Sequence, residues 1–230
     1  YLRPMFTTEE IWCQLFSEPG SGSDLASLST KAVDDGDGYI VNGQKVWTTL
    51  GHLAKWGLIV TRTDPNVPKH RGLTFFIVDM ESEGVDVRPL RQITGEAEFN
   101  EVYFTDVKIP KENILGSLGE GWRVSLTILM NERVAIGGNV RERGSGAPGH
   151  LVQLWKEKNL QDPVTRDKLI KLWIEQEAVR LTNMRAVENR EKGTPGPEGS
   201  TSKLYEAEIN KASYEFGMDM LGNDGLLFPR

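Results

Sequence analysis

Residues 39–49 of the chain read Tyr39-Ile40-Val41-Asn42-Gly43-Gln44-Lys45-Val46-Trp47-Thr48-Thr49. The runs on both sides of Asn42-Gly43 are rich in β-branched and aromatic residues. Because Asn and Gly both tolerate a positive φ angle, this dipeptide between two such runs is typical of a two-residue hairpin turn. The sequence therefore predicts a β-hairpin whose turn is Asn42-Gly43.

Further β-forming runs follow this segment, at residues 58–61, 73–78, 85–88 and 100–104. Gly, Pro, Asp and Asn separate them at short intervals, as in turns. No segment long enough for a crossover helix lies between them, which favours hairpins over βαβ units. We therefore expect residues 1–117 to form an antiparallel β-barrel or sandwich.

The second half of the chain, residues 118–230, has a helical pattern. Apolar residues recur near a period of 3.6 from Gly119 onward. A long helix is predicted over about 162–192, starting at Asp162-Pro163, and another over about 200–221, ending at Gly222. The segment 144–149 is rich in Gly and Pro, and the segment 193–199 is a predicted loop. The expected fold class is α+β, an antiparallel β-barrel or sandwich followed by an antiparallel helical bundle.

Composition excludes several function classes. The net charge of −6 argues against a nucleic-acid partner, and no apolar run approaches the ~20 residues of a membrane span. The single cysteine, Cys13, permits no disulfide within the chain, and the three histidines lie far apart, so no metal site is predicted. We expect an intracellular soluble protein, in the cytoplasm or, in a eukaryote, the mitochondrial matrix. The ends at Tyr1 and Arg230 suggest a fragment.

One candidate binding segment is Phe16-Ser17-Glu18-Pro19-Gly20-Ser21-Gly22-Ser23-Asp24. Glycines in a tight turn let a ligand approach the backbone closely. Serine hydroxyls and backbone N–H groups suit anionic oxygens. The alternative is a solvated turn, since loops of Ser and Gly are common.

A second candidate is the pair Trp47 and Thr49, which lie two apart on a strand and should share a face. An indole can pack on a flat heteroaromatic ring while the hydroxyl bonds to the edge of that ring. The alternative is a core tryptophan beside a β-forming threonine. A third segment, residues 104–110, leads into Gly119-Glu120-Gly121-Trp122 and can be an edge strand that runs into a helix.

Taken in order, these three segments resemble the acyl-CoA dehydrogenase family. The resemblance covers Trp12 to about Ile136 and, less strongly, Lys203 to Gly225. It implies an N-terminal helical domain, a middle β domain and a C-terminal helical bundle, of which this chain would hold the last two. It also implies FAD-dependent desaturation of an acyl-CoA in fatty acid and lipid metabolism, transfer of electrons to an electron-transfer flavoprotein, and usually a homotetramer.

The resemblance implies that six residues contact the cofactor: Phe16, Ser17, Gly22, Ser23, Trp47 and Thr49. Within this set, the Trp47 indole would pack on the isoalloxazine and Thr49 would bond to its edge near N5. Ser23 would also lie beside the acyl-CoA, as would Arg133.

The catalytic base of the family is a glutamate at one of two places. Most members carry it in a late segment resembling Tyr-Glu-Gly-Thr, which this sequence does not contain. Others carry it on the helix after the β domain, where this chain has Asn131-Glu132-Arg133. The apolar neighbours of Glu132 at i±3 and i±4 predict that it lies on a buried stripe, which suits a carboxylate that accepts a proton. An inter-helix salt bridge is the alternative role for Glu132.

Two regions depart from the family pattern. An Arg-x-x-Phe-Gly stretch that reaches the FAD of a neighbouring subunit has no match in residues 159–164. In residues 219–225, Asp219 and Asn223 replace the Gln and second Gly of Gln-x-Leu-Gly-Gly-x-Gly. Two further interpretations therefore stay open, a non-catalytic or half-site partner subunit of a heteromeric enzyme and a flavin-dependent acyl-CoA oxidase.

Overall fold

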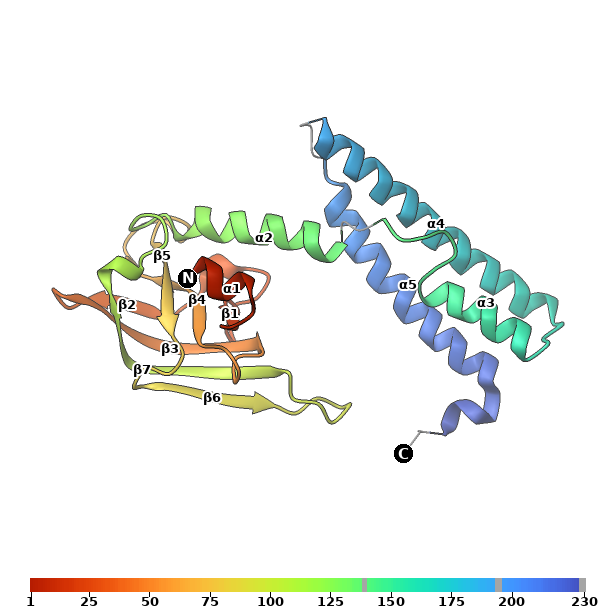
Figure 1. Cartoon of the computed structure of the whole chain (residues 1–230), viewed down its shortest axis with the longest axis horizontal. Coiled ribbons are helices and arrows are strands. Elements are labelled where there is room, and N and C mark those ends of the chain that lie inside the picture. The colour runs from red at the N-terminus through yellow and green to blue at the C-terminus, as the bar shows by residue number, and fades with distance from the viewer. Residues whose placement is uncertain (138–139, 193–195, 228–230) are drawn as a thin grey trace. The chain divides into compact units, whose positions relative to one another are not determined.

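The computed structural model describes residues 1–137, 140–192 and 196–227, without the side chains of 133–137. The chain forms two compact units, Tyr1–Ile128 and Leu129–Arg230. Helix α2 (Gly121–Gly137) begins close to the predicted boundary at residue 117 and continues across the division between the units (Figure 1).

The first unit is built on one seven-stranded sheet with the order β1-β4-β2-β3-β7-β6 and with β5 on β4. The strands are β1 (Trp12–Leu15), β2 (Lys31–Asp34), β3 (Gly38–Thr49), β4 (Trp56–Arg62), β5 (Leu73–Asp79), β6 (Val85–Leu90) and β7 (Phe99–Pro110). Short helical turns accompany them at α1 (Leu2–Phe6), η1 (Leu25–Ser27) and η2 (Lys111–Asn113). The predicted α+β class is confirmed. The sheet is mixed, however, because β1 and β2 both pair with β4 in parallel.

The predicted hairpin at Asn42-Gly43 is wrong, because β3 runs through both residues without a turn. The two residues lie instead at a register shift between β3 and β7. A Cβ atom on Gly43 would lie 2.4 Å from the hydroxyl oxygen of Thr30 and 2.7 Å from its Cα. The glycine is therefore required by the close approach of Thr30.

The turn that precedes β3 lies at residues 35–37, where Gly36 has a φ of +100°. The carboxylates of Asp34 and Asp35 accept hydrogen bonds from the N–H groups of Gly36 and Gly38, both at 2.8 Å. Aspartates that bond to the backbone two or three residues later are a common means of stabilising a turn.

The core of the first unit is formed by apolar side chains of the sheet. Apolar side chains that alternate along β1, β3, β4, β5 and β7 fill it, among them Leu15, Val41, Ile59, Phe76 and Val107. Cys13 belongs to this core, and burial raises the pKa of its thiol to about 12.

Besides the end of α2, the described residues of the second unit form α3 (Ala147–Glu157), α4 (Pro163–Glu191) and α5 (Glu198–Leu221), followed by a turn at η3 (Gly222–Leu226). The predicted start of α4 is confirmed, since the Asp162 carboxylate accepts hydrogen bonds from the N–H and hydroxyl of Thr165, both at 2.7 Å. The glycine end of α5 is also confirmed, with a φ of +58° at Gly222.

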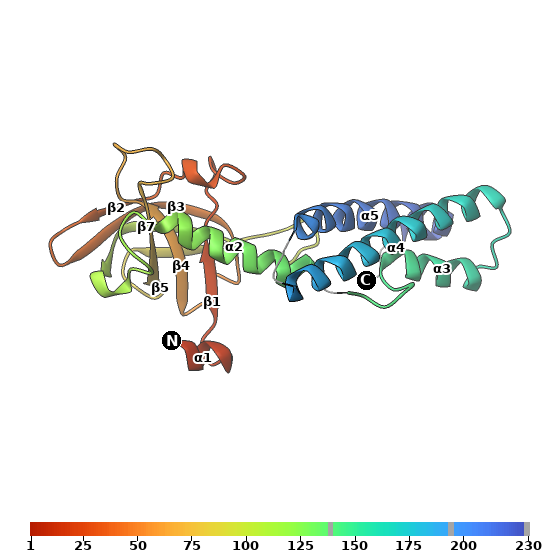
Figure 2. The ribbon, with the colours of Figure 1, turned by 90° about the horizontal axis from the view of Figure 1, so that it is seen from above.

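Helix α3 begins within the Gly/Pro-rich stretch over residues 144–149. Gly144 and Gly146 do have positive φ angles, but Ala147-Pro148 already form the first turn of α3. Helices α3, α4 and α5 lie side by side in both views (Figures 1 and 2) and share a core of Leu151, Leu169, Phe216 and Met220. Within the described residues, no helix has the length and apolar character needed to cross a bilayer.

Candidate functional site

The Ser/Gly loop after β1 is closed at its base by two backbone hydrogen bonds. The Glu18 N–H donates to the Ser21 carbonyl at 2.8 Å, and the Ser21 N–H donates to the Glu18 carbonyl at 3.1 Å. Gly22 and Ser23 follow this closed turn and are exposed, and a Cβ atom on Gly22 would have nothing within 4 Å. The loop therefore has a fixed turn followed by an open segment to which a ligand has access.

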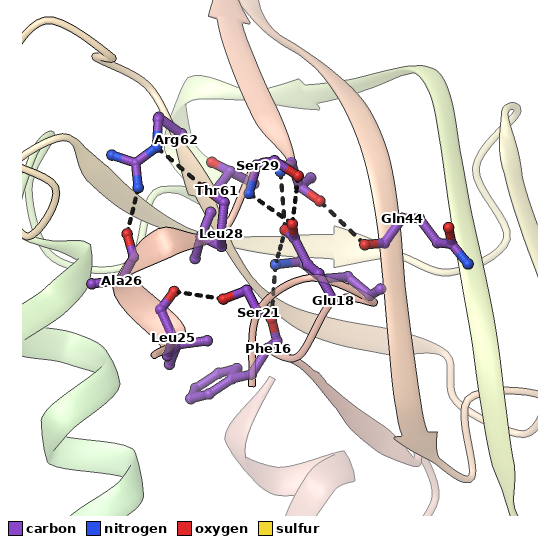
Figure 3. A network of polar contacts seen from close by, with 12 residues as sticks. Phe16, Glu18, Ser21, Leu25, Ala26, Leu28, Ser29, Gln44, Thr61 and Arg62 are labelled. Atoms are coloured by element: carbon purple, nitrogen blue, oxygen red, sulfur yellow. Dashed lines mark hydrogen bonds and ion pairs between the residues drawn. The ribbon is translucent and has the colours of Figure 1, made fainter. Parts of the chain in front are cut away.

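A buried carboxylate holds this loop in place, as Figure 3 shows. Glu18 accepts hydrogen bonds from the Ser29 N–H and hydroxyl, both at 2.7 Å, and from the Thr30 N–H at 2.9 Å. Its remaining donor is the Lys45 ammonium at 2.9 Å. Arg62 holds the segment after the loop by donating to the carbonyls of Ala26 and Leu28.

Lys45 lies on β3 with its side chain fully buried. Its Nζ donates to the Glu18 carboxylate and to the Phe16 carbonyl, both at 2.9 Å. Burial lowers the pKa of Lys45 to about 8, although the Glu18 charge opposes this shift. Burial alone would raise the pKa of Glu18, but the Lys45 charge and the donated hydrogen bonds outweigh it and lower that pKa to about 2. Both groups are therefore charged at neutral pH.

The sequence pattern assigns no role to Glu18 or Lys45, although both stand in the segments singled out above. The one local signal is that Lys45 stands within a β-forming run. The structure then shows that its side chain is fully buried. Since lysine is almost never fully buried without a partner, such a position points to an ion pair. The partner is 27 residues away, and only the fold identifies it.

Phe16 and Ser17 begin the loop. The Phe16 ring is 6% exposed and packs edge-on against Phe75, with 5.6 Å between ring centroids. Ser17 is half-buried, and its carbonyl accepts the Val46 N–H at 2.9 Å. The Phe16 ring thus supports the loop from the core, whereas Ser17 retains some accessible surface.

Trp47 and Thr49 are both exposed, while their neighbours Val46 and Thr48 are buried. Burial alternates over these four residues, which supports the predicted shared face of Trp47 and Thr49. The alternative of a core tryptophan is wrong, because 62% of Trp47 is exposed. Among the described aromatic rings, only Phe99 contacts the Trp47 indole, in an edge-on arrangement with 6.1 Å between ring centroids.

The backbone of Trp47 is strained. Its φ is +60°, a left-handed conformation that is uncommon for a bulky residue and costs roughly 1–3 kcal/mol. Strain of this kind persists only where the surrounding structure enforces it, and it concentrates at functional sites. A strained and exposed aromatic ring beside an exposed hydroxyl is therefore a candidate surface for a flat ligand.

Asn100 on β7 holds the end of β3 next to Trp47. Its side chain is fully buried, and its Nδ2 donates to the carbonyls of Thr48 at 2.9 Å and Glu98 at 3.1 Å. Its Oδ1 lies 3.1 Å from Nδ1 of His52. The sequence alone places Asn100 in a β-forming run and gives no sign of this role.

Glu132 lies on α2 in the second unit and is half-buried, as are Ile128 and Leu129 at i−4 and i−3. The side chains of Arg133, Ala135 and Ile136 are outside the described residues. The predicted apolar stripe is therefore described on one side of Glu132 only.

The Ser/Gly loop and the segment around Trp47 belong to the part of the sequence that matches the family model "Acyl-CoA dehydrogenase, middle domain", at residues 13–107. Residues 119–229 match "Acyl-CoA dehydrogenase, C-terminal domain". The chain belongs to the acyl-CoA dehydrogenase family. Acyl-CoA dehydrogenases are flavoprotein oxidoreductases, so a flavin is the ligand against which the site is judged.

Curated acyl-CoA dehydrogenases from Mycobacterium tuberculosis are similar to the chain. It is 42% identical to acyl-CoA dehydrogenase FadE34 over 228 residues, which are 96% of this chain and 31% of the relative. It is 38% identical to acyl-CoA dehydrogenase IpdE1 over 221 residues, which are 96% of this chain and 57% of that relative. The chain thus spans between about a third and three fifths of these acyl-CoA dehydrogenases.

Solved structures support the same fold. The Tcur3481–Tcur3483 steroid ACAD matches with a TM-score of 0.90 and 28% identity, covering 100% of this chain and 60% of that one. The ChsE4–ChsE5 complex from M. tuberculosis matches with a TM-score of 0.83 and 28% identity, covering 99% and 60%. An acyl-CoA dehydrogenase from Geobacillus kaustophilus matches with a TM-score of 0.86 and 29% identity, covering 99% and 62%.

The residues of the first unit fit the flavin that acyl-CoA dehydrogenases carry. The exposed Trp47 ring offers a flat apolar surface and Thr49 a hydroxyl on the same face. The open space at Gly22 admits a ligand close to the backbone. Ser17, Gly22 and Ser23 could meet such a ligand from the loop, while the buried Phe16 ring fixes the start of that loop.

Proposed function

We propose that the protein catalyses the FAD-dependent α,β-dehydrogenation of an acyl-CoA thioester to the trans-2-enoyl-CoA. The observation that carries the proposal is the strained, exposed indole of Trp47 with Thr49 on the same face, in a chain of this family. When bound, FAD supplies the acceptor for the hydride that leaves the β-carbon. The protein's own residues bind and orient the cofactor and the acyl-CoA, and they remove the α-proton.

In this proposal, Trp47 packs on the isoalloxazine and the Thr49 hydroxyl donates to its edge. Gly22 and Ser23, which follow the closed turn, approach the cofactor and the acyl-CoA. Ser17 contributes from the start of the loop, and Phe16 acts through the rigidity of its buried ring. Arg133 is assigned to the substrate.

Glu132 is the proposed base that removes the α-proton. This proton is weakly acidic in water, so a carboxylate must be positioned beside it, with the thioester carbonyl polarised. Glu132 is half-buried on α2, as are Ile128 and Leu129 one turn before it, which limits its contact with water. This partial burial supports a base at Glu132.

The test of this role is Glu132→Gln in the full-length protein loaded with FAD. We expect the variant to retain bound FAD and to lose desaturation by several orders of magnitude, because the amide cannot accept the proton. Glu208→Gln, an exposed glutamate on helix α5, is the matched control and should turn over normally. Normal desaturation by Glu132→Gln would refute the assignment.

The partners of the proposed enzyme are an acyl-CoA substrate and an electron-transfer flavoprotein as acceptor, and its assembly is a tetramer in the cytoplasm. A panel of acyl-CoAs assayed with an artificial electron acceptor identifies the acyl group. A steroid-bearing CoA thioester belongs in that panel, since the similar Tcur3481–Tcur3483 structure is described as a steroid ACAD.

A heteromeric enzyme in which this chain supplies part of the site is the second candidate. Asp219, Asn223 and the unmatched residues 159–164 favour it, because the family uses these places for FAD contacts between subunits. The similar ChsE4–ChsE5 structure is also a complex. Retention of FAD only after co-expression with a second homologous chain would support this candidate. Hydrogen peroxide formation would instead indicate an acyl-CoA oxidase.

A further inference from the structure

We propose that Lys45 and Asn100 are positioning residues that together hold Trp47 in its left-handed conformation and so set the flavin-facing surface. The inference rests on the proposed function, because it assigns these residues to the geometry of the cofactor site. Neither residue needs to touch the cofactor, since each acts through the backbone around Trp47.

The geometry begins with a β-bulge. Lys45 pairs with Val102 and Thr48 pairs with Asn100, so that Val46 and Trp47 together face the single residue Glu101 on β7. The extra residue of a bulge bends its strand and redirects a side chain. At this bulge, the redirected residue is the exposed Trp47.

Lys45 fixes the side of the bulge that precedes Trp47. Its buried ammonium donates to the Phe16 carbonyl and to the Glu18 carboxylate, both at 2.9 Å. The next residue, Val46, turns its N–H to the Ser17 carbonyl at 2.9 Å rather than to β7. These bonds join the bulge to the Ser/Gly loop, so the two parts of the proposed flavin surface share one support.

Asn100 fixes the side that follows Trp47. It is the Cα partner of Thr48, and its Nδ2 donates to the Thr48 carbonyl at 2.9 Å. Its Oδ1 can accept from His52 when the proton is on Nδ1, and the Leu50 N–H donates to the Glu98 carbonyl at 2.8 Å. The side-chain amide of Asn100 thereby restrains the backbone that follows Trp47.

Packing alone would not require these residues. A buried ammonium must leave water, and an apolar side chain of similar volume often serves stability equally well. Lys45 ties the residue before the bulge to the Phe16 carbonyl, and Asn100 donates to the Thr48 carbonyl directly after Trp47. The backbone is thus restrained on both sides of Trp47, an arrangement that can enforce an otherwise unfavourable φ.

The same pair of strands offers a matched control. A second register shift between β3 and β7 contains Asp106, whose φ is +51°, and Asn42 bonds to its side chain and N–H, both at 3.0 Å. This exposed bulge has the same kind of polar bridge. It lies away from Trp47 along β3, and no residue of the proposed flavin surface belongs to it.

The experiment compares Lys45→Met, Asn100→Ala and Asn42→Ala in the full-length, assembled protein. The measurements are the Kd for FAD, the visible circular dichroism of bound flavin, and the melting temperature of the apoprotein. We expect Lys45→Met and Asn100→Ala to weaken FAD binding by about tenfold or more and to change the flavin spectrum. Asn42→Ala should lower the melting temperature and leave both flavin readouts unchanged.

A purely structural role for Lys45 and Asn100 predicts lower melting temperatures with wild-type Kd and spectrum, and that result would overturn the inference. If either variant does not fold, Glu18→Gln removes the charge that pairs with Lys45 at nearly constant volume, and His52→Ala removes a contact of Asn100 from an exposed position. Wild-type flavin readouts in both milder variants would equally overturn it. A wild-type protein that binds no FAD would instead refute the proposed function.

Discussion

At the scale of single residues, Glu18 makes stability depend on pH. Its pKa falls from its usual 4.5 to about 2 on folding, because Lys45 and the donated hydrogen bonds outweigh burial. The folded protein therefore binds fewer protons than the unfolded chain in this range. The stabilisation from Glu18 is complete above about pH 5 and is lost as the pH falls through the folded pKa near 2.

We expect the free energy of unfolding to fall between about pH 5 and pH 2, and Glu18→Gln to remove part of that dependence. Denaturant titrations at a series of pH values measure it. Glu83→Gln, an exposed glutamate, is the control and should retain the wild-type slope. Parallel pH profiles for the wild type and Glu18→Gln would contradict the prediction.

The direction and contacts of a single side chain are predictable from the sequence where they depend on residues nearby in the chain. The alternation of side chains along a strand is enough to predict that Trp47 and Thr49 share a face. The supports of Trp47 are not predictable in this way, since Asn100 lies 52 residues from Thr48. The positive φ at Trp47 also has no local cause in its residue type, because indole side chains do not favour it.

At the scale of elements, the first turn of α4 depends on its cap. Asp162 accepts from the N–H and hydroxyl of Thr165, which satisfies one of the free donors at the helix start. We expect Asp162→Ala to lower the stability of the second unit by about 1 kcal/mol. Thermal or chemical unfolding followed by helical circular dichroism measures the loss.

The matched substitution is Asp167→Ala on the same helix. Asp167 is exposed and pairs with Lys171 one turn later, a surface interaction of roughly a few tenths of a kcal/mol. Equal losses from the two substitutions would show that the cap contributes nothing beyond an ordinary surface charge.

Element prediction succeeds for helices with caps and fails where long-range packing decides the outcome. Asn42-Gly43 has the composition of a turn, yet β3 continues through both residues, and Thr30 approaches Gly43 too closely for a side chain there. The parallel pairing of β1 with β4 joins strands about 40 residues apart and has no local signature. The start of helix α3 is not predicted, because glycine and proline at this position are more typical of a loop.

At the scale of the whole chain, each compact unit has a core of its own. The core of the first unit is formed by apolar side chains of the sheet. The core of the second is formed by Leu151, Leu169, Phe216 and Met220 of α3, α4 and α5. Units with separate cores often unfold as separate cooperative blocks.

We expect hydrogen exchange under mild denaturant to protect β3 and β7 with one opening free energy and α4 and α5 with another. Asp162→Ala should lower protection in the helices alone, and Glu18→Gln in the strands alone. A single opening energy that both substitutions shift together would mean that the chain unfolds as one block.

The buried thiol of Cys13 has a practical consequence for labelling. The thiolate is the form that attacks alkylating reagents, and a pKa of about 12 keeps this buried thiol protonated near neutral pH. The chain has no other cysteine. A cysteine introduced by Ile93→Cys, at an exposed position between β6 and β7, would therefore take up a maleimide dye selectively. Flavin binding could then be followed as quenching of a single fluorophore, with Cys13 left in place.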